Sequence, residues 1–74
     1  MRPITKIQAR ILDVITTSID ERGFPPTIRE ICKAIEMHST STVAYQLQAL
    51  EARGYIRRFD GTARGIKIIE RKPL

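Results

Sequence analysis

Several features that small proteins often use are scarce or missing in this chain of 74 residues. It has no tryptophan and a single cysteine, Cys32, so no disulfide can form within it. The opening residues Met1–Lys6 lack the apolar core of a secretion signal, and no apolar run approaches the roughly 18 residues that cross a membrane. These absences exclude a disulfide-stapled secreted module and predict a cytoplasmic protein with no membrane partner.

Charge of either sign is missing from residues 37–50 (MHSTSTVAYQLQAL), in a chain where 28% of the residues are charged. The net charge is +5, and most of the excess follows this stretch. Residues 1–38 hold six basic and five acidic side chains, whereas residues 39–74 hold seven basic and three acidic. A basic excess favours an anionic partner, nucleic acid before a membrane surface. Many small proteins are basic for solubility, so charge alone does not decide the partner.

Two segments carry the pattern of a capping box, in which a threonine hydroxyl and the side chain three residues later cap a helix start. They are Thr5–Gln8 and Thr27–Glu30. Apolar residues follow each box at helical spacing, which predicts helices over residues 5–22 and 28–35. Gly23 is a typical stop for the first of these helices.

A third helix is predicted from residues 39–41 to Gly54, after which the chain changes to a β pattern. Strands are predicted over residues 55–59 and 66–69, with a turn at Asp60-Gly61. The fold class is therefore mainly α with a small β-hairpin, a three-helix winged helix-turn-helix. We expect this domain to cover residues 1–70, with residues 71–74 as a tail or the start of a linker.

The exposed face of the third helix is unusual. Burial of Val43, Leu47 and Leu50 turns hydroxyl, amide and phenol groups outward, where a solvated helix usually carries Lys and Glu. Such groups donate to and accept from base edges, and Thr and Ala methyl groups suit thymine methyls. A polar helix without a partner is the alternative. The basic residues of the neighbouring hairpin favour DNA, because they can meet its phosphates.

Four blocks of the chain form a recognisable signature: GFPPTIREI at residues 23–31, STSTVAYQL at 39–47, LEARGYI at 50–56 and RGI at 64–66. They resemble the N-terminal DNA-binding domain of the LexA repressor family over about residues 4–69. The resemblance implies that the third helix enters the major groove while the wing touches the backbone. It also implies a bacterial or phage protein at the nucleoid. Two copies would act as a homodimer on an inverted repeat and repress SOS (DNA-damage-response) genes.

The resemblance also implies which residues meet double-stranded DNA. The base-reading positions are Ser39, Ser41, Thr42, Ala44, Tyr45 and Gln46. The positions expected on the DNA backbone are Thr27, His38, Thr40, Arg57, Arg58, Arg64 and Lys67. The sequence STSTV at residues 39–43 resembles the helix of Gram-positive members of the family, and this resemblance implies GAAC/GTTC half-sites. Ala44, Tyr45 and Gln46 differ from the residues expected for that operator.

Two departures from the family pattern matter. Glu36 stands where members usually have glycine, and a positive φ there would cost about 1–2 kcal/mol unless the turn is reshaped. The family's self-cleaving protease domain has no room in 74 residues, so we expect no enzyme activity. The chain is then either part of a longer repressor or a free-standing phage or mobile-element regulator.

Other expectations complete the sequence-based interpretation. A winged-helix module that binds protein remains the alternative function, although the exposed helix face offers it only a small apolar patch. No cofactor, metal or small-molecule ligand is expected. We expect Cys32, Phe24 and Phe59 in the core. We expect the following residues to be solvated charges: Arg22, Arg53 and Arg71.

Overall fold

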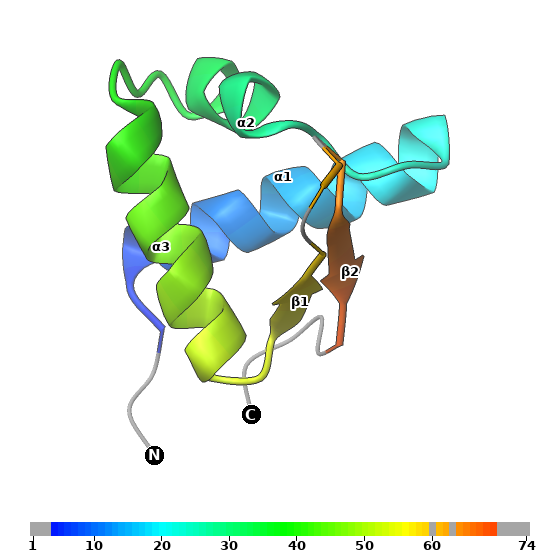
Figure 1. The fold of residues 1–74 in the computed structure, drawn as a ribbon. Coiled ribbons are helices and arrows are strands. Elements are labelled where there is room, and N and C mark those ends of the chain that lie inside the picture. The colour runs from blue at the N-terminus through cyan, green and yellow to red at the C-terminus, as the bar shows by residue number, and fades with distance from the viewer. Residues whose placement is uncertain (1–3, 60, 63, 70–74) are drawn as a thin grey trace.

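The computed structural model describes residues 4–59, 61–62 and 64–69. The elements in chain order are α1 (Lys6–Arg22), α2 (Ile28–Ala34), α3 (Thr40–Ala52), β1 (Ile56–Arg58) and β2 (Ile66–Ile68) (Figure 1). Three helices followed by an antiparallel hairpin confirm the predicted winged helix-turn-helix fold. Asp60 of the predicted turn, Arg71 and the predicted tail over residues 71–74 lie outside the described residues.

Both predicted capping boxes form. The Gln8 amide N–H donates to the Thr5 hydroxyl (3.2 Å), and the Thr5 N–H donates to Gln8 Oε1 (3.0 Å). The second box repeats this arrangement with Thr27 and Glu30, at 3.1 and 2.9 Å. Each box supplies partners for backbone N–H groups that a helix start leaves unpaired, so these two starts are fixed by residues only three positions apart.

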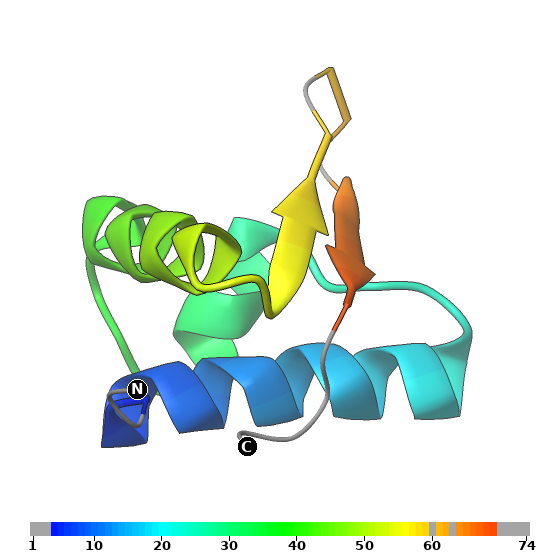
Figure 2. The ribbon, with the colours of Figure 1, turned by 90° about the horizontal axis from the view of Figure 1, so that it is seen from below.

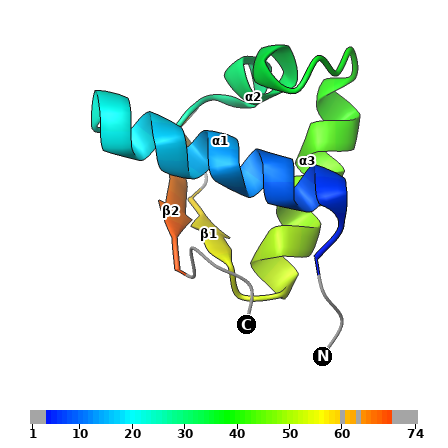
Figure 3. The ribbon, with the colours of Figure 1, turned by 180° about the vertical axis from the view of Figure 1, so that it is seen from behind.

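The first helix lies on one side of the molecule, where α3 crosses it and the hairpin stands beside α3 (Figures 1 and 3). The core lies between these elements. The three apolar residues predicted to be buried on the third helix, Val43, Leu47 and Leu50, are fully buried in it. Burial of each such side chain stabilises the fold by about 1.5–3 kcal/mol. The end of the hairpin that joins its strands projects to the side opposite α1 (Figure 2). That side therefore carries both α3 and the hairpin tip.

The hairpin pairs Ile56 with Ile68, Arg57 with Lys67 and Arg58 with Ile66. Its strands are shorter than the predicted 55–59 and 66–69. Ile56 and Ile66 are buried against the helices, whereas the alternation of a strand turns Arg57 and Lys67 to the solvent.

The turn between α2 and α3 keeps the shape that suits glycine. Glu36 has φ 59°, the left-handed region, so the positive φ considered from the sequence is confirmed. The Met37 N–H donates to the Cys32 carbonyl (2.8 Å), and the Glu36 N–H donates to the Lys33 carbonyl (3.3 Å). These two bonds form a Schellman motif with Glu36 at its left-handed position. Glu36 is therefore strained at this position.

Two aromatic residues predicted in the core are at the surface. Phe24 is 41% exposed and Phe59 is 49% exposed, so this prediction was wrong. Phe24 follows the left-handed Gly23 in the connection to α2, where two arginine side chains cover its ring. Phe59 follows β1 and shares the outward face of that strand with Arg57. Cys32 is buried as expected.

No helix in the described part of the chain is both long enough and apolar enough to pass through a lipid bilayer.

Candidate nucleic-acid interface

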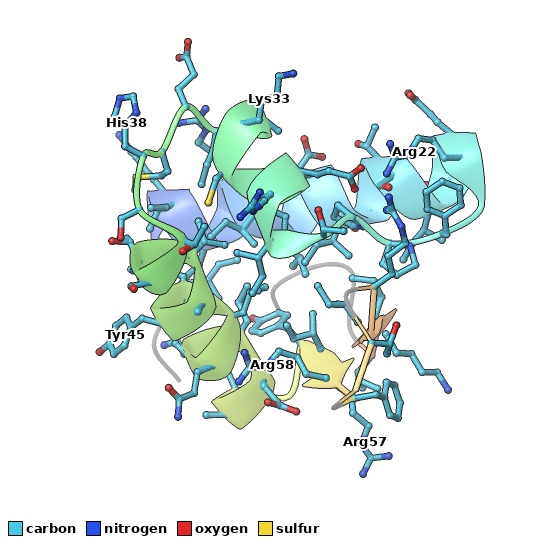
Figure 4. All side chains as sticks on the ribbon, turned by 45° about the horizontal axis from the view of Figure 1, so that its top comes forward. Arg22, Lys33, His38, Tyr45, Arg57 and Arg58 are labelled. Carbon is cyan, nitrogen blue, oxygen red and sulfur yellow. The ribbon has the colours of Figure 1, made fainter. Side chains whose placement is uncertain are left out.

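The start of α3 presents short polar groups on an exposed surface. Ser39 caps the helix by accepting the Thr42 amide N–H (3.3 Å), and the first turn, Thr40–Thr42, carries only short side chains. Tyr45 is 68% exposed and projects from the middle of the helix, while His38 projects from the turn before it (Figure 4). No charged side chain occurs on α3 before Glu51. The predicted uncharged face is therefore present on the folded helix.

The six residues expected to read bases all lie on α3 or at its N-cap. Ser39, Ser41 and Tyr45 are exposed, whereas Thr42, Ala44 and Gln46 are half-buried. Two predicted backbone-contact residues lie at the same helix start, and a third lies at the start of α2. Thr40 and His38 are exposed there, and Thr27 is half-buried at the N-cap of α2. Each of the exposed groups is accessible to a ligand that approaches the start of α3.

One of the predicted base-reading residues is held by α1. Gln8 Nε2 donates to Gln46 Oε1 (3.0 Å), and Gln8 Oε1 receives the Thr5 N–H of the capping box. Arg53 Nη1 also donates to Gln8 Oε1 (3.4 Å), so the expectation that Arg53 is only a solvated charge was wrong. The start of α1 is thereby connected to the middle and the end of α3.

Arg57 and Lys67 form an exposed pair of like charges on the hairpin. They lie directly opposite each other in the strand register, and both side chains are exposed. Figure 4 shows Arg57 extending away from the helices. Like charges opposite each other in a sheet repel and destabilise it. An anion between or beside them would remove that repulsion, which makes this pair a natural contact for phosphate.

Arg58, by contrast, is bound to α3. Its backbone N–H donates to Glu51 Oε2 (2.9 Å) and its Nε donates to Glu51 Oε1 (3.2 Å). The backbone hydrogen bond and then the guanidinium hold the pKa of Glu51 below its usual range. This ion pair joins the hairpin to the end of α3, so Arg58 is less available for phosphate than Arg57.

The side chain of Arg64 also turns to a carboxylate. Its Nη1 and Nη2 donate to the two oxygens of Glu30, at 2.8 and 3.0 Å, and Nη1 donates to the Pro25 carbonyl as well (2.9 Å). Arg22 reaches the same carboxylate, with its Nη2 2.9 Å from Glu30 Oε1. The expectation that Arg22 is only a solvated charge was therefore wrong.

Three residues that contact the candidate interface were missed by the sequence analysis. Glu30 and Gln8 were interpreted only as capping residues, and Glu51 was given no role. Their partners lie 34, 38 and 7 positions away along the chain. A local pattern carries no signal for the two long-range contacts, because they exist only once the helices pack.

Comparison with known proteins identifies the family. The model of the LexA DNA-binding domain matches residues 1–65 of the chain. A LexA repressor 2 of Nocardia farcinica is 49% identical over 65 residues, which cover 88% of this chain and 27% of that protein. The LexA repressor of Mycobacterium tuberculosis strain H37Ra is 48% identical over 65 residues, covering 88% of this chain and 28% of that protein.

A LexA repressor of Frankia casuarinae is 42% identical over 66 residues, or 89% of this chain and 26% of that protein. The chain thus spans about a quarter of the length of these relatives. The part that matches the family model contains the three helices and the first strand of the hairpin, β1. On this match and this fold, the chain belongs to the LexA DNA-binding domain family.

Proposed function

We propose that this chain binds double-stranded DNA sequence-specifically, as the DNA-binding part of a LexA-type transcriptional repressor. In this proposal α3 enters the major groove and the hairpin lies along the phosphate backbone. One observation carries it furthest: the exposed face of α3 has no charge, while the exposed Arg57–Lys67 pair stands on the adjacent hairpin. Neutral donors and acceptors suit base edges, and cations suit phosphates.

The shape of the molecule supports this assignment. The short side chains at the start of α3 allow its backbone to approach a groove floor closely. The hairpin tip projects on the same side as α3, away from α1, so both elements can meet one duplex (Figure 2). The base-reading residues in this proposal are Ser39, Ser41, Thr42, Ala44, Tyr45 and Gln46. Thr40, His38, Arg57 and Lys67 are the proposed contacts to phosphate.

The proposed operator is an inverted repeat of GAAC/GTTC half-sites, with one copy of the chain on each half. The relatives named above are LexA repressors. From this similarity we propose that the chain takes part in repression of DNA-damage-response genes. A single domain offers a small interface, so each half-site alone would be bound weakly. Two copies on adjacent half-sites bind more tightly through proximity, and we expect the free chain to be a monomer or a weak dimer.

Fluorescence anisotropy on two duplexes tests the proposal. One carries the inverted GAAC/GTTC repeat and the other a scrambled sequence of the same composition, each at low and near-physiological salt. Preference for the repeat at both salt concentrations is the expected result. Equal, salt-sensitive binding to both duplexes would reject the operator and leave general DNA binding. No binding to either at low salt would favour the protein-interaction module instead.

A matched pair of hydroxyl deletions assigns the reading face. Ser41→Ala removes an exposed hydroxyl from α3, and Thr17→Ala removes an exposed hydroxyl from α1, on the far side. If α3 reads bases, Ser41→Ala lowers discrimination at one base pair by about 1–3 kcal/mol, whereas Thr17→Ala leaves it unchanged. Identical affinities of the two variants for every single-base change in the operator would contradict the proposed reading face.

A further inference from the structure

The hairpin is attached to the helices at two carboxylates, one from each helix of the helix-turn-helix. Glu51 of α3 holds Arg58 at the end of β1. Glu30 of α2 holds Arg64, which lies just before β2. The Phe59 N–H donates to the Gly65 carbonyl (2.8 Å) between these two arginines. A Cβ at Gly65 would lie 2.4 Å from the Phe59 carbonyl oxygen, so the strands approach closely at this point.

The contacts of Arg64 use three of the five N–H donors of its guanidinium, while its side chain is 38% exposed. The two hydrogen bonds to Glu30 form a fork, and the bond to the Pro25 carbonyl uses another of its five N–H donors. The guanidinium carbon also lies 4.6 Å from the centre of the Phe24 ring, within cation–π range. To bind a phosphate with the fork that now holds Glu30, Arg64 would have to give up both hydrogen bonds to that carboxylate.

Glu30 is in turn held from two further directions. Its Oε1 receives the Thr27 N–H of the capping box (2.9 Å) and Nη2 of Arg22 (2.9 Å). Arg22 also lies over the Phe24 ring, 4.6 Å from its centre. The carboxylate therefore joins the end of α1, the start of α2 and the hairpin. Hydrogen bonds from Arg64, Thr27 and Arg22 lower the pKa of Glu30 to about 2, so this carboxylate stays ionised at neutral pH.

We infer that Arg64 is a positioning residue, which sets the placement of the hairpin against the helix-turn-helix through Glu30 and contributes no phosphate contact itself. This inference rests on the proposed function, and it assigns the phosphate contacts of the hairpin to Arg57 and Lys67. The competing account has Arg64 leaving Glu30 to bind phosphate. The two accounts differ in the effect of Glu30, because only the first requires that carboxylate.

Glu30→Gln is the decisive variant. Glutamine serves in a capping box as glutamate does, and Gln8 already does so in α1, so the start of α2 is preserved. If Arg64 positions the hairpin, Glu30→Gln weakens binding to the operator, by about threefold to tenfold if the hairpin is correctly placed in only a third to a tenth of the molecules. If Arg64 instead binds phosphate, the loss of a negative charge frees it and binding is unchanged or tighter.

Two variants of Arg64 give an independent readout. Arg64→Gln and Arg64→Lys both remove the fork, and we expect both to weaken binding to the same degree as Glu30→Gln. The double variant Glu30→Gln/Arg64→Gln should be no weaker than either single one. The dependence of log K on log salt should keep its slope, whereas loss of a phosphate contact lowers that slope by about 0.9. A slope reduced in Arg64→Gln, with Arg64→Lys near the unaltered protein, would overturn the inference.

Measurement on the free protein separates this inference from the proposed function. In two-dimensional NMR spectra, Glu30→Gln and Arg64→Lys should shift the same β1 and β2 amides, and these amides should exchange hydrogen faster. Arg10→Gln removes an exposed charge from α1 and should leave them in place. Hairpin amides that stay unshifted would overturn the inference whether or not DNA binds. Shifted amides in a chain that binds neither duplex at low salt would uphold the attachment and reject the DNA function.

Discussion

Gln8 Nε2 donates a hydrogen bond to Gln46 Oε1 across 3.0 Å, and this contact fixes which end of the Gln46 amide faces outward. Gln8 Oε1 already accepts the Thr5 backbone N–H, which can only donate, so the Gln8 nitrogen must be the group that faces Gln46. Gln46 therefore offers its NH₂ group, a donor, to a ligand of α3. A two-point contact with one adenine would have to share the Gln46 oxygen with Gln8.

The first prediction inverts that amide. Glu at position 8 keeps the capping box but has no donor, so in Gln8→Glu the Gln46 side chain should turn its NH₂ toward position 8 and its oxygen outward. We expect a changed base preference at one operator position, measured with a panel of single-base variants. Stability should change little, and a thermal melt serves as the control. If Gln8→Glu and the unaltered chain had the same base preference at every operator position, Gln46 would not read DNA.

The second prediction concerns the exposed like-charge pair. Arg57→Gln and Lys67→Gln should each lower the slope of log K against log salt by about 0.9, because each removes one phosphate contact. Both variants should weaken operator and scrambled duplexes by the same factor, since phosphates carry no sequence.

The control for this pair is Arg10→Gln, which removes an equal charge from an exposed position on α1. Its slope should match that of the unaltered chain. Three equal slopes in the three variants would show that net charge, and not the position of the pair on the hairpin, governs the salt dependence.

The third prediction is a gain of stability. Glu36→Gly places glycine at the left-handed position of a Schellman motif, where a side chain is disfavoured, and should raise the free energy of unfolding by about 1 kcal/mol. In a domain of this size that corresponds to a rise in melting temperature of about 4–8 °C. Urea denaturation measures the change directly.

Gly54 supplies the matched comparison. It has φ 83° at the end of α3, and the Tyr55 N–H donates to the Leu50 carbonyl (3.0 Å) in the same motif. Nothing lies within 4 Å of a Cβ built there, so Gly54→Ala should lose stability through backbone strain alone, by about 1 kcal/mol. If the two substitutions changed stability in the same direction, backbone strain could not be the cause.

The fourth prediction concerns pH. The pKa of Glu30 falls from its ordinary 4.5 to about 2, chiefly because of the hydrogen bond from Arg64, then those from the Thr27 amide and Arg22. A lowered pKa means that this carboxylate stabilises the fold above about pH 4.5 and that the contribution is lost as the pH falls toward 2. The carboxyl carbon signal of Glu30 should therefore titrate near pH 2.

Removal of the partner tests the cause of that shift. In Arg64→Gln the titration midpoint of Glu30 should move upward toward 4.5, while Thr27 and Arg22 keep it from reaching that value. An unchanged midpoint would show that Arg64 does not contact Glu30 in solution.

The sequence was sufficient for the features that depend on near neighbours. Thr5 and Gln8, like Thr27 and Glu30, are three residues apart, and both capping boxes form where their pattern predicts them. The buried stripe of α3 also follows from spacing alone, because a helix returns to the same face every three to four residues. The left-handed conformation of Glu36 was one of two alternatives that the sequence left open, because glycine usually stands there in the resembled family, and the structure decides between them.

The sequence was insufficient where a side chain has a choice of partners. Four arginines were predicted from the sequence either to be solvated or to contact phosphate, but each forms a hydrogen bond with a residue that packing brings near: Arg22, Arg53, Arg58 and Arg64. Phe24 was expected in the core because of its apolarity, yet two guanidiniums cover it at the surface. Such pairings depend on the distances between whole elements, which no local pattern encodes.

The two capping boxes have a consequence for protein engineering. In each box the residue that completes the cap also supports the candidate interface, since Gln8 orients Gln46 and Glu30 binds Arg64. Glutamine and glutamate are interchangeable as caps. In this chain they are not interchangeable, because position 8 needs an amide donor for Gln46 and position 30 needs a carboxylate for Arg64. If α3 or the hairpin of this chain were grafted onto a relative, it would therefore keep its geometry only if Gln8 and Glu30 were transplanted with it.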